Sequence, residues 1–123
     1  MGSSQIRFRA WDKKKNDWFD EDDGDLYIEL NGNINFGWNG EIMDDYTDRI
    51  ILMQYTGRKD SEGNEIYEGD ILQSEHYFKY QMVFKGDCWR CESLKHSRLK
   101  NRFIGSNLKI IGNIYENPEL LED

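Results

Sequence analysis

Apolar and polar residues alternate in several short segments of the chain, and this pattern predicts β-strands. Residues 6–12 (IRFRAWD) alternate apolar side chains with two arginines before a tryptophan ends the alternation. A period of two is typical of a strand with one buried face. Residues 26–30 and 34–38 are two further apolar runs, and the Asn-Gly-Asn between them tolerates positive φ. These two runs are therefore expected to pair as a hairpin.

The centre of the chain, ILMQYTGRKDSEGNEIYEGDIL (51–72), has an apolar-turn-apolar pattern. Its first part, together with Ile50, predicts a buried strand over 50–55, and the polar stretch that follows predicts a chain reversal. The apolar pattern then resumes around Glu-Gly-Asp at 68–70, which suits a bulge or a short turn. Just before this stretch, partial helical spacing leaves a short helix over 42–49 and irregular structure both open.

The last third of the chain predicts three more strands. Residues 76–84 combine aromatic and β-branched side chains, and 88–94 return after a Lys-Gly-Asp turn. One helical turn is expected near 97–103, and 108–115 form the last strand. Pro118 suits the first position of a single C-terminal turn, because its missing N–H is not needed there.

Many short strands with regular turn signals are typical of a small all-β barrel or open sandwich. We therefore expect a mainly β fold with a small barrel-like (SH3-like) C-terminal part, an N-terminal β-hairpin region and short helical turns. The predicted domains are an N-terminal β-hairpin subdomain over 1–49, packed on a small β-barrel over 50–123.

Composition places the protein among ordered, intracellular proteins. Aromatic residues make up 14% of the 123 residues, and disordered chains are poor in them. The sequence contains neither an apolar run of about twenty residues nor a secretory segment, so we expect a soluble protein without membrane contact. Two cysteines are too few for a disulfide scaffold, and a reducing cytoplasm is the expected location.

The net charge of −8 is unevenly distributed. Residues 1–70 carry 8 Lys and Arg against 17 Asp and Glu, whereas residues 71–123 carry 8 against 7. Residues 85–109 contain 7 basic and 2 acidic residues, so this segment could attract a polyanion that the whole molecule repels. The candidate nucleic-acid contacts are Lys95, Arg98, Lys100 and Arg102.

Four potential zinc ligands are Cys88, Cys91, His76 and His96. Zinc requires such ligands to converge on a tetrahedron. If 88–94 is a strand, however, residues three apart point to opposite faces. Packing cysteines are the preferred interpretation, and we expect neither a metal site nor a cofactor.

The acidic run over 20–25 suggests a calcium loop, but its register is wrong. An EF-hand has glycine at loop position 6, acidic or amide ligands at positions 1, 3 and 5, and glutamate at position 12. With Gly24 at position 6, Phe19 falls at position 1 and Leu30 at position 12. A solvated acidic loop is the better interpretation.

Catalytic motifs are missing from the sequence. There is no glycine-rich phosphate loop, nucleophile elbow or HExxH pattern. The two histidines have no identifiable nucleophile or orienting carboxylate. We expect a protein that is not an enzyme.

Four segments resemble the motifs of a known family when they are taken together. They are IRFRAWD (6–12), ILMQYTG (51–57), GNEIYEGDI (63–71) and IIGNIYENPELL (110–121). In order and spacing they are similar to the YopX family of small bacteriophage and prophage proteins. The resemblance implies a β-rich fold and a phage or prophage source, and it implies no activity and no catalytic residues.

The two central motifs also suggest a structural role. Each has an aromatic residue followed by a glycine, and we interpret both as corners of a small barrel where the chain reverses. The corner residues are Tyr55, Gly57, Tyr67, Gly69 and Asp70. The Asp70 carboxylate is expected to accept hydrogen bonds from backbone N–H groups in its corner.

Three hypotheses for function follow. The first is a non-enzymatic accessory factor that binds a host or phage protein, because an acidic surface and many aromatic residues suit protein interfaces. The second is a nucleic-acid-binding module that uses residues 85–109. The third is an acidic decoy that mimics nucleic acid. The sequence leaves the partner, homo-oligomerisation and the stage of the phage cycle open.

Overall fold

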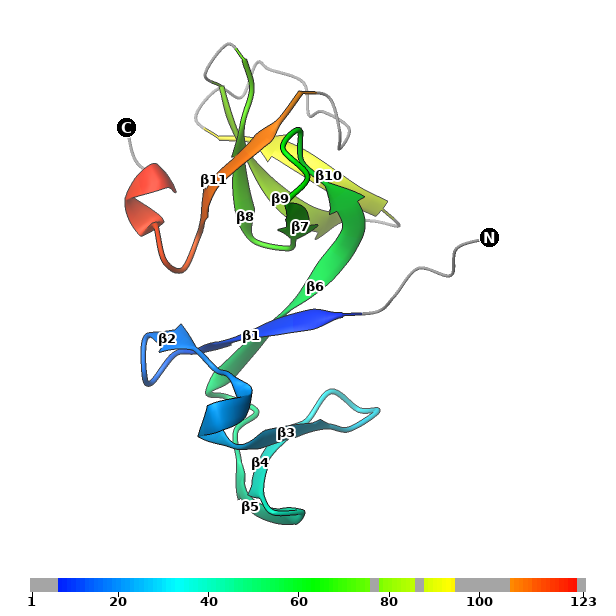
Figure 1. Ribbon diagram of the computed structural model, residues 1–123, viewed down its shortest axis with the longest axis vertical. Helices are drawn as coiled ribbons and strands as arrows, with labels where there is room; N and C mark the ends of the chain where they lie inside the picture. The colour runs from blue at the N-terminus through cyan, green and yellow to red at the C-terminus, as the bar shows by residue number, and fades with distance from the viewer. Residues whose placement is uncertain (1–6, 76–77, 86–87, 95–106, 122–123) are drawn as a thin grey trace. The chain divides into compact units, whose positions relative to one another are not determined.

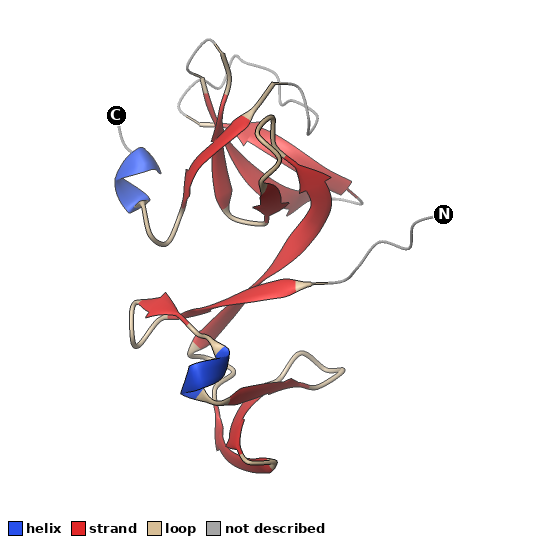
Figure 2. Cartoon of the chain, in the orientation of Figure 1, coloured by secondary structure: helices blue, strands red, loops and turns tan. Residues whose placement is uncertain are grey.

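The computed structural model describes residues 7–75, 78–85, 88–94 and 107–121. Strands dominate this part of the chain, so the prediction of a mainly β fold is confirmed (Figure 2). In chain order the strands are β1 (Phe8–Asp12), β2 (Asp17–Trp18), β3 (Asp25–Ile28), β4 (Ile34–Trp38), β5 (Glu41–Asp45), β6 (Ile50–Lys59), β7 (Glu65–Tyr67), β8 (Asp70–Gln73), β9 (Lys79–Lys85), β10 (Cys88–Ser93) and β11 (Lys109–Asn113). Two short 3-10 helices, η1 (Glu21–Asp23) and η2 (Pro118–Leu121), complete the described elements (Figure 1). Neither of these single turns is long and apolar enough to cross a membrane, and no other helix occurs in the described residues.

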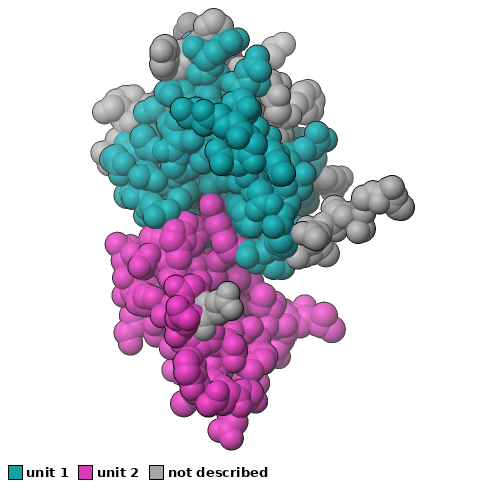
Figure 3. Space-filling view, viewed as in Figure 1, with its two compact units in different colours: residues 1–8, 53–123 teal, residues 9–52 magenta. Residues whose placement is uncertain are grey.

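The strands form sheets of order β2-β1-β6-β7, β3-β4-β5 and β10-β9-β8-β11. The chain divides into two compact units, each defined by the contacts within it (Figure 3). Unit 2 is Arg9–Leu52, and unit 1 is Met1–Phe8 together with Met53–Asp123. The division into a subdomain over 1–49 and a barrel over 50–123 stays a prediction.

In unit 2, β1 and β2 form a hairpin with aromatic residues in register. Trp11 lies opposite Trp18, and their rings meet edge to face with centroids 5.0 Å apart. The guanidinium of Arg9 lies over the Trp18 ring, 4.9 Å from its centroid. Trp11 is buried, so this pair anchors the hairpin.

The β3-β4-β5 sheet of unit 2 is centred on Phe36. Its ring stacks on Tyr46 at 4.7 Å and meets Phe19 edge to face at 6.2 Å. Gly24 has a φ of +128°, and a Cβ at this position would overlap the Phe36 ring, so glycine leaves room for that ring. The predicted hairpin of 26–30 with 34–38 is present as β3 and β4.

In unit 1, the β10-β9-β8-β11 sheet curls around an apolar core. The buried side chains of this core come from β7, β8, β9, β10 and the segment before β11. They are Ile66, Leu72, Tyr80, Met82, Cys91 and Leu108. The predicted strands of the last third are present as β9, β10 and β11, and the predicted turn at Pro118 is η2.

Two interpretations of local structure need correction. For 42–49 the sequence leaves a short helix and irregular structure open, but 41–45 form strand β5 and a turn follows. The spacing misled because Ile42 and Met43 are exposed and do not belong to a buried helical stripe.

The chain also does not reverse at Gly57: β6 continues to Lys59, and the reversal occurs at 60–64. Gly57, with φ of +83°, lies where the β6–β7 register shifts, since a positive-φ glycine suits a bulge as well as a turn. The helical turn expected at 97–103 lies outside the described residues.

Candidate protein-binding surface

Unit 2 carries almost all of the net charge of the protein. Residues 9–52 contain 5 Lys and Arg against 12 Asp and Glu, a balance of −7, and the whole chain has −8. Between residues 17 and 48 there are 11 acidic residues and no lysine, arginine or histidine. A stretch of one sign creates a local field that attracts cationic partners.

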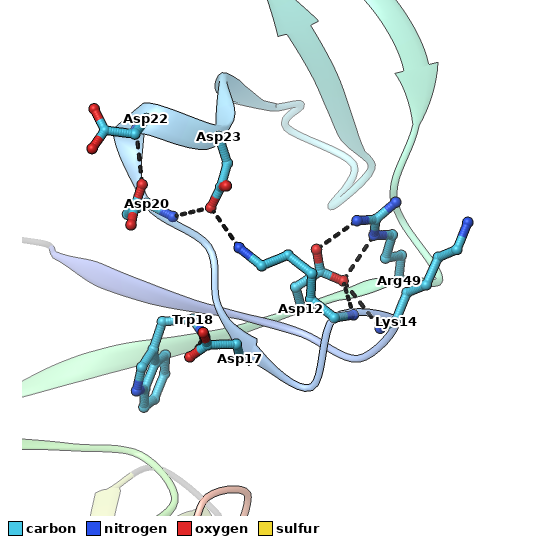
Figure 4. Close-up of polar contacts among 9 residues, drawn as sticks. Asp12, Lys14, Asp17, Trp18, Asp20, Asp22, Asp23 and Arg49 are labelled. Carbon is cyan, nitrogen blue, oxygen red and sulfur yellow. Dashed lines mark hydrogen bonds and ion pairs between the residues drawn. The ribbon is translucent and has the colours of Figure 1, made fainter.

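Two basic residues of unit 2, Arg49 and Lys15, form ion pairs near the β1–β2 turn (Figure 4). Arg49 pairs with Asp12 through both carboxylate oxygens, and Lys15 lies 2.9 Å from the Asp23 carboxylate. In the described part of the chain, no ion pair involves the acidic residues of β3, β4 or β5. The carboxylate of Asp44 still interacts with the charge of Arg49, whose pKa is raised first by Asp12 and also by Asp44, so the acidic charge of this sheet is only partly balanced within the protein.

Asp12 is a buried carboxylate with a complete set of hydrogen-bond donors. It accepts from Nε and Nη2 of Arg49 at 2.8 and 2.7 Å, and from the backbone N–H groups of Lys14 and Lys15 at 3.0 and 3.2 Å. The Arg49 hydrogen bond, which outweighs the effect of burial, holds the pKa of Asp12 below its usual value. These contacts close the β1–β2 turn and give the Asp12 carboxylate a structural role.

The acidic loop over 20–25 is organised by its own backbone. Asp20 accepts the N–H of Asp22 at 2.8 Å, and Asp23 accepts the N–H of Asp20 at 3.0 Å (Figure 4). The Asp20 N–H and then Lys15 lower the pKa of Asp23. Among the described residues, no group of three potential metal ligands gathers here or elsewhere.

The β4–β5 connection presents apolar side chains in this acidic setting. Asn39 and Gly40 both have positive φ, +52° and +84°, and they form a two-residue hairpin turn. Around this turn Trp38, Ile42 and Met43 are exposed, with fractional exposures of 48%, 62% and 65%. We call residues 38–45 the tip hairpin. Its acidic members are Glu41, Asp44 and Asp45.

The tip hairpin stands on a closely packed base. A Cβ at Gly37 would lie 2.6 Å from both the Tyr27 ring and the backbone oxygen of Glu41. The Tyr27 ring therefore lies directly on the β4 backbone, and β3, β4 and β5 approach closely at this point. Asp45 is fixed as well, because its carboxylate accepts the side-chain and backbone donors of Thr47, which also lower its pKa.

β5 is the edge strand of its sheet. It has β4 as its one neighbour among the described strands, and all five of its residues are exposed. The outer edge of such a strand offers backbone N–H and C=O groups to another chain. Part of this edge is covered, because Asp44 accepts the N–H of Asp45 at 2.8 Å.

The candidate nucleic-acid contacts Lys95, Arg98, Lys100 and Arg102 lie outside the described residues. Three other basic residues of 85–109 are described. Lys85 pairs with Glu92, Lys109 lies 3.8 Å from Glu62, and Arg90 is exposed on β10. Beside them, Phe84 and Trp89 meet edge to face at 4.9 Å, and Phe84 is exposed.

The cysteines lie on opposite faces of β10. Cys88 is exposed and Cys91 is part of the core of unit 1. This is the arrangement expected for residues three apart in a strand. His76 and His96 lie outside the described residues, so the zinc hypothesis for these four residues stays untested.

The predicted corner residues lie in unit 1. Gly69, with φ of +88°, donates its N–H to Met82 and accepts from Ile114, so it links β9 to the segment after β11. The buried Asp70 accepts the N–H of Tyr67 at 2.7 Å. Tyr55 and Tyr67 lie opposite each other on β6 and β7, with ring centroids 5.4 Å apart. Gly57 has open space around it.

Sequence reasoning missed the tip hairpin. The available signal was Asn39-Gly40, the strongest two-residue hairpin turn, directly after Trp38. Had that turn taken precedence over the helical spacing of 42–49, the exposed apolar residues on a returning edge strand would have been predicted.

Comparisons with known proteins agree with the motifs. The sequence matches the model of the YopX protein family over residues 7–122. Protein EF1440 from Enterococcus faecalis has a similar structure, with a TM-score of 0.64 and 28% identity over 98% of this chain and 100% of that chain. Protein yopX from Bacillus subtilis is similar in fold, with a TM-score of 0.62 and 22% identity over 98% and 100% of the two chains. A comparison with curated proteins gives no match. Because the family match spans nearly the whole sequence, the chain belongs to the YopX family.

Proposed function

We propose that the protein is a non-enzymatic accessory factor of phage or prophage origin that binds another protein in the bacterial cytoplasm through its tip hairpin. The observation that carries the proposal is the exposure of Trp38, Ile42 and Met43 within a stretch that has 11 acidic and no basic residues. Exposed apolar groups with a polar rim are typical of protein interfaces. The phage setting rests on the family resemblance.

The described carboxylates support a non-enzymatic role. Strongly perturbed acids often mark catalytic sites, but structural networks perturb them too. Asp12 is fully used by Arg49 and a turn, and Asp60 by three backbone N–H groups from Glu62, Asn64 and Ile110. Both acids therefore hold loops in place.

A pull-down tests the proposal. The tagged full-length protein is mixed with a lysate of Enterococcus faecalis, the source of one similar structure, with and without nuclease. We expect a stoichiometric protein that survives nuclease and is lost with the triple variant Trp38→Ser, Ile42→Ser and Met43→Ser. The matched control is Phe84→Ser with Leu121→Ser, which removes exposed apolar groups from unit 1. If both variants capture the same proteins as the wild type, the tip hairpin is not the binding surface.

A second candidate function is nucleic-acid binding by residues 85–109. The observation in its favour is the exposed Phe84, which meets the partly buried Trp89 edge to face on a hairpin that also carries Lys85 and Arg90, because bases stack on aromatic rings in a cationic surface. It predicts affinity for single-stranded DNA that falls steeply with salt. Replacing Arg98, Lys100 and Arg102 by Ala, or Phe84 by Ala, should weaken that affinity. Unchanged fluorescence anisotropy of labelled oligonucleotide with both variants would exclude it.

The third candidate is the acidic decoy, which the run of 11 acidic residues over 17–48 supports. A decoy competes with DNA for the same host protein. Adding duplex DNA to the pull-down separates the two roles: release of the captured protein favours the decoy, and retention favours a partner that binds elsewhere.

A further inference from the structure

We propose that an extended, basic segment of the partner protein adds to the free edge of β5 as a fourth strand of the β3-β4-β5 sheet. This inference rests on the proposed function and names the chemistry of the partner. Main-chain hydrogen bonds to a sheet edge supply affinity, and alternating side chains supply specificity.

The geometry of β5 suits strand addition. Glu41–Asp45 is five residues long, so it offers roughly 17 Å of edge at the usual rise per residue. Two exposed apolar residues, Ile42 and Met43, lie between Glu41 and Asp44, and these two acids pair with Trp38 and Phe36, which are two residues apart on β4. The β4 register shifts between Phe36 and Gly37, opposite Met43, so β5 bulges there and stays irregular enough to avoid pairing at random.

The charge of β5 selects the partner. Glu41, Asp44 and Asp45 have no ion pair in the described part of the chain, and no basic residue occurs between 17 and 48. Opposite charges across neighbouring strands are favourable, and like charges directly opposite are unfavourable. A second copy of β5 would place acid against acid, so this edge disfavours self-pairing. A strand with lysine or arginine at alternate positions is complementary to it.

Peptides of defined sequence test the inference on the full-length protein. The probe is a fluorescein-labelled octapeptide of alternating Lys and Val, and its binding is followed by anisotropy. Two control peptides are the same sequence with every backbone amide methylated, which leaves no N–H donor on either edge of the strand, and an alternating Glu and Val octapeptide. We expect only the unmethylated Lys-Val peptide to bind. Its affinity should fall about tenfold between low and physiological salt, because the charges are exposed.

A charge swap distinguishes strand addition on β5 from general attraction to an acidic protein. The variant Glu41→Lys with Asp44→Lys should no longer bind the Lys-Val peptide and should bind the Glu-Val peptide. A misfolded protein would not show this new binding. The control Glu62→Lys with Glu119→Lys makes the same change of net charge in unit 1 and should behave as the wild type. Amide hydrogen exchange of residues 41–45 should slow when the Lys-Val peptide binds.

Each outcome separates this inference from the proposed function. Binding of the methylated peptide as strongly as the parent, no slowing of exchange in β5, or equal behaviour of the two charge-reversed variants overturns strand addition. Self-association of the protein through β5 overturns it as well. If these tests fail while the pull-down partner still requires Trp38, Ile42 and Met43, the tip hairpin remains the interface and the added strand alone is wrong.

Discussion

At the scale of single residues, buried carboxylates hold the turns of this protein. Asp12 closes the β1–β2 turn with Arg49, and Asp60 joins the 60–64 turn to β11 through the N–H of Ile110, 50 residues further along the chain. In both cases the donors include backbone N–H groups of the turn, Lys14 and Lys15 for Asp12 and Glu62 and Asn64 for Asp60. A buried N–H without an acceptor costs free energy comparable to a lost hydrogen bond.

Asp12→Asn should destabilise unit 2 strongly. The variant leaves the half-buried Arg49 without its counter-charge and replaces one acceptor oxygen by a donor. We expect a loss of about 3 kcal/mol, the lower end for breaking a buried pair, since Arg49 keeps some contact with water. Urea unfolding followed by tryptophan fluorescence measures it, because Trp11, Trp18 and Trp38 all lie in unit 2. The control Asp22→Asn changes an exposed acid in the same unit and should have little effect.

Asp12 also makes stability depend on pH in the acidic range. Its pKa is lowered in the folded state, chiefly by Arg49, from an ordinary value of about 3.9. Its contribution is therefore complete above the ordinary pKa and is lost as the pH falls through the folded-state pKa. Between pH 5 and pH 2.5 the wild type should lose more stability than Asp12→Asn. The pKa values of Asp23, Asp45 and Asp60 are also lowered, and this holds in the wild type and in Asp12→Asn alike. Only the difference between the two stability-against-pH curves therefore reports on Asp12. Parallel curves would contradict this assignment.

Asp60→Asn should loosen unit 1. Burial raises the pKa of Asp60, but the N–H groups of Ile110, Asn64 and Glu62 together outweigh it and lower the pKa. An asparagine keeps one acceptor and turns an N–H₂ group toward donors, so we expect a loss of about 2 kcal/mol. Thermal unfolding measures it. Glu62→Gln is the matched control in the same turn, because Glu62 is exposed and its 3.8 Å contact with Lys109 is weak; an equal loss in both variants would argue against a specific role of Asp60.

At the scale of elements, two glycines of one hairpin serve different purposes. Gly37 makes room: a Cβ there would lie 2.6 Å from the Glu41 backbone oxygen, which belongs to a paired strand and cannot move freely. Gly40 has open space around it and is required for its positive φ of +84°. The β3-β4-β5 sheet thus depends on close approach at one glycine and on backbone conformation at the other.

Alanine substitutions separate these two effects. Gly37→Ala should destabilise unit 2 by about 2 kcal/mol, because the added methyl overpacks the strand contact. Gly40→Ala should cost about 1 kcal/mol for a left-handed conformation, without any clash. Urea unfolding of both variants gives the comparison, and amide exchange should show faster opening of β3, β4 and β5 for Gly37→Ala. A larger effect at Gly40 would reverse this assignment.

The elements that could be predicted from sequence are those whose pattern and turn chemistry agree. The β3–β4 hairpin combines apolar runs with Asn-Gly-Asn, and it is present. At 42–49 the helical spacing of apolar residues conflicts with the Asn39-Gly40 turn, and the turn decides. Sequence also does not show which apolar residues remain exposed, so the tip hairpin emerges only when the strand order places β5 at an edge. The Asp12–Arg49 pair joins residues 37 apart and has no local pattern.

At the scale of the whole molecule, the net charge of −8 is a local property. Unit 2 holds −7 of it, and the part without any basic residue includes the whole of β3, β4 and β5. An exposed sheet edge invites association with other copies, and acidic side chains on that edge oppose it. The same charges that oppose pairing of two copies would attract a basic strand, so the repulsion between copies and the proposed choice of partner would have one physical origin.

We therefore expect the wild-type protein to be monomeric, and removal of the edge charges to make it self-associate. In the variant Glu41→Val with Asp44→Val, like charges no longer face each other across two copies of β5, and the N–H of Asp45 loses the Asp44 carboxylate that covers it. Sedimentation velocity at increasing concentration should show dimers or larger species for this variant. The control Glu62→Val with Glu119→Val removes the same charge from unit 1 and should stay monomeric. Dimers of the wild type at low salt, or a double variant on β5 that remains monomeric, would mean that charge does not govern this edge.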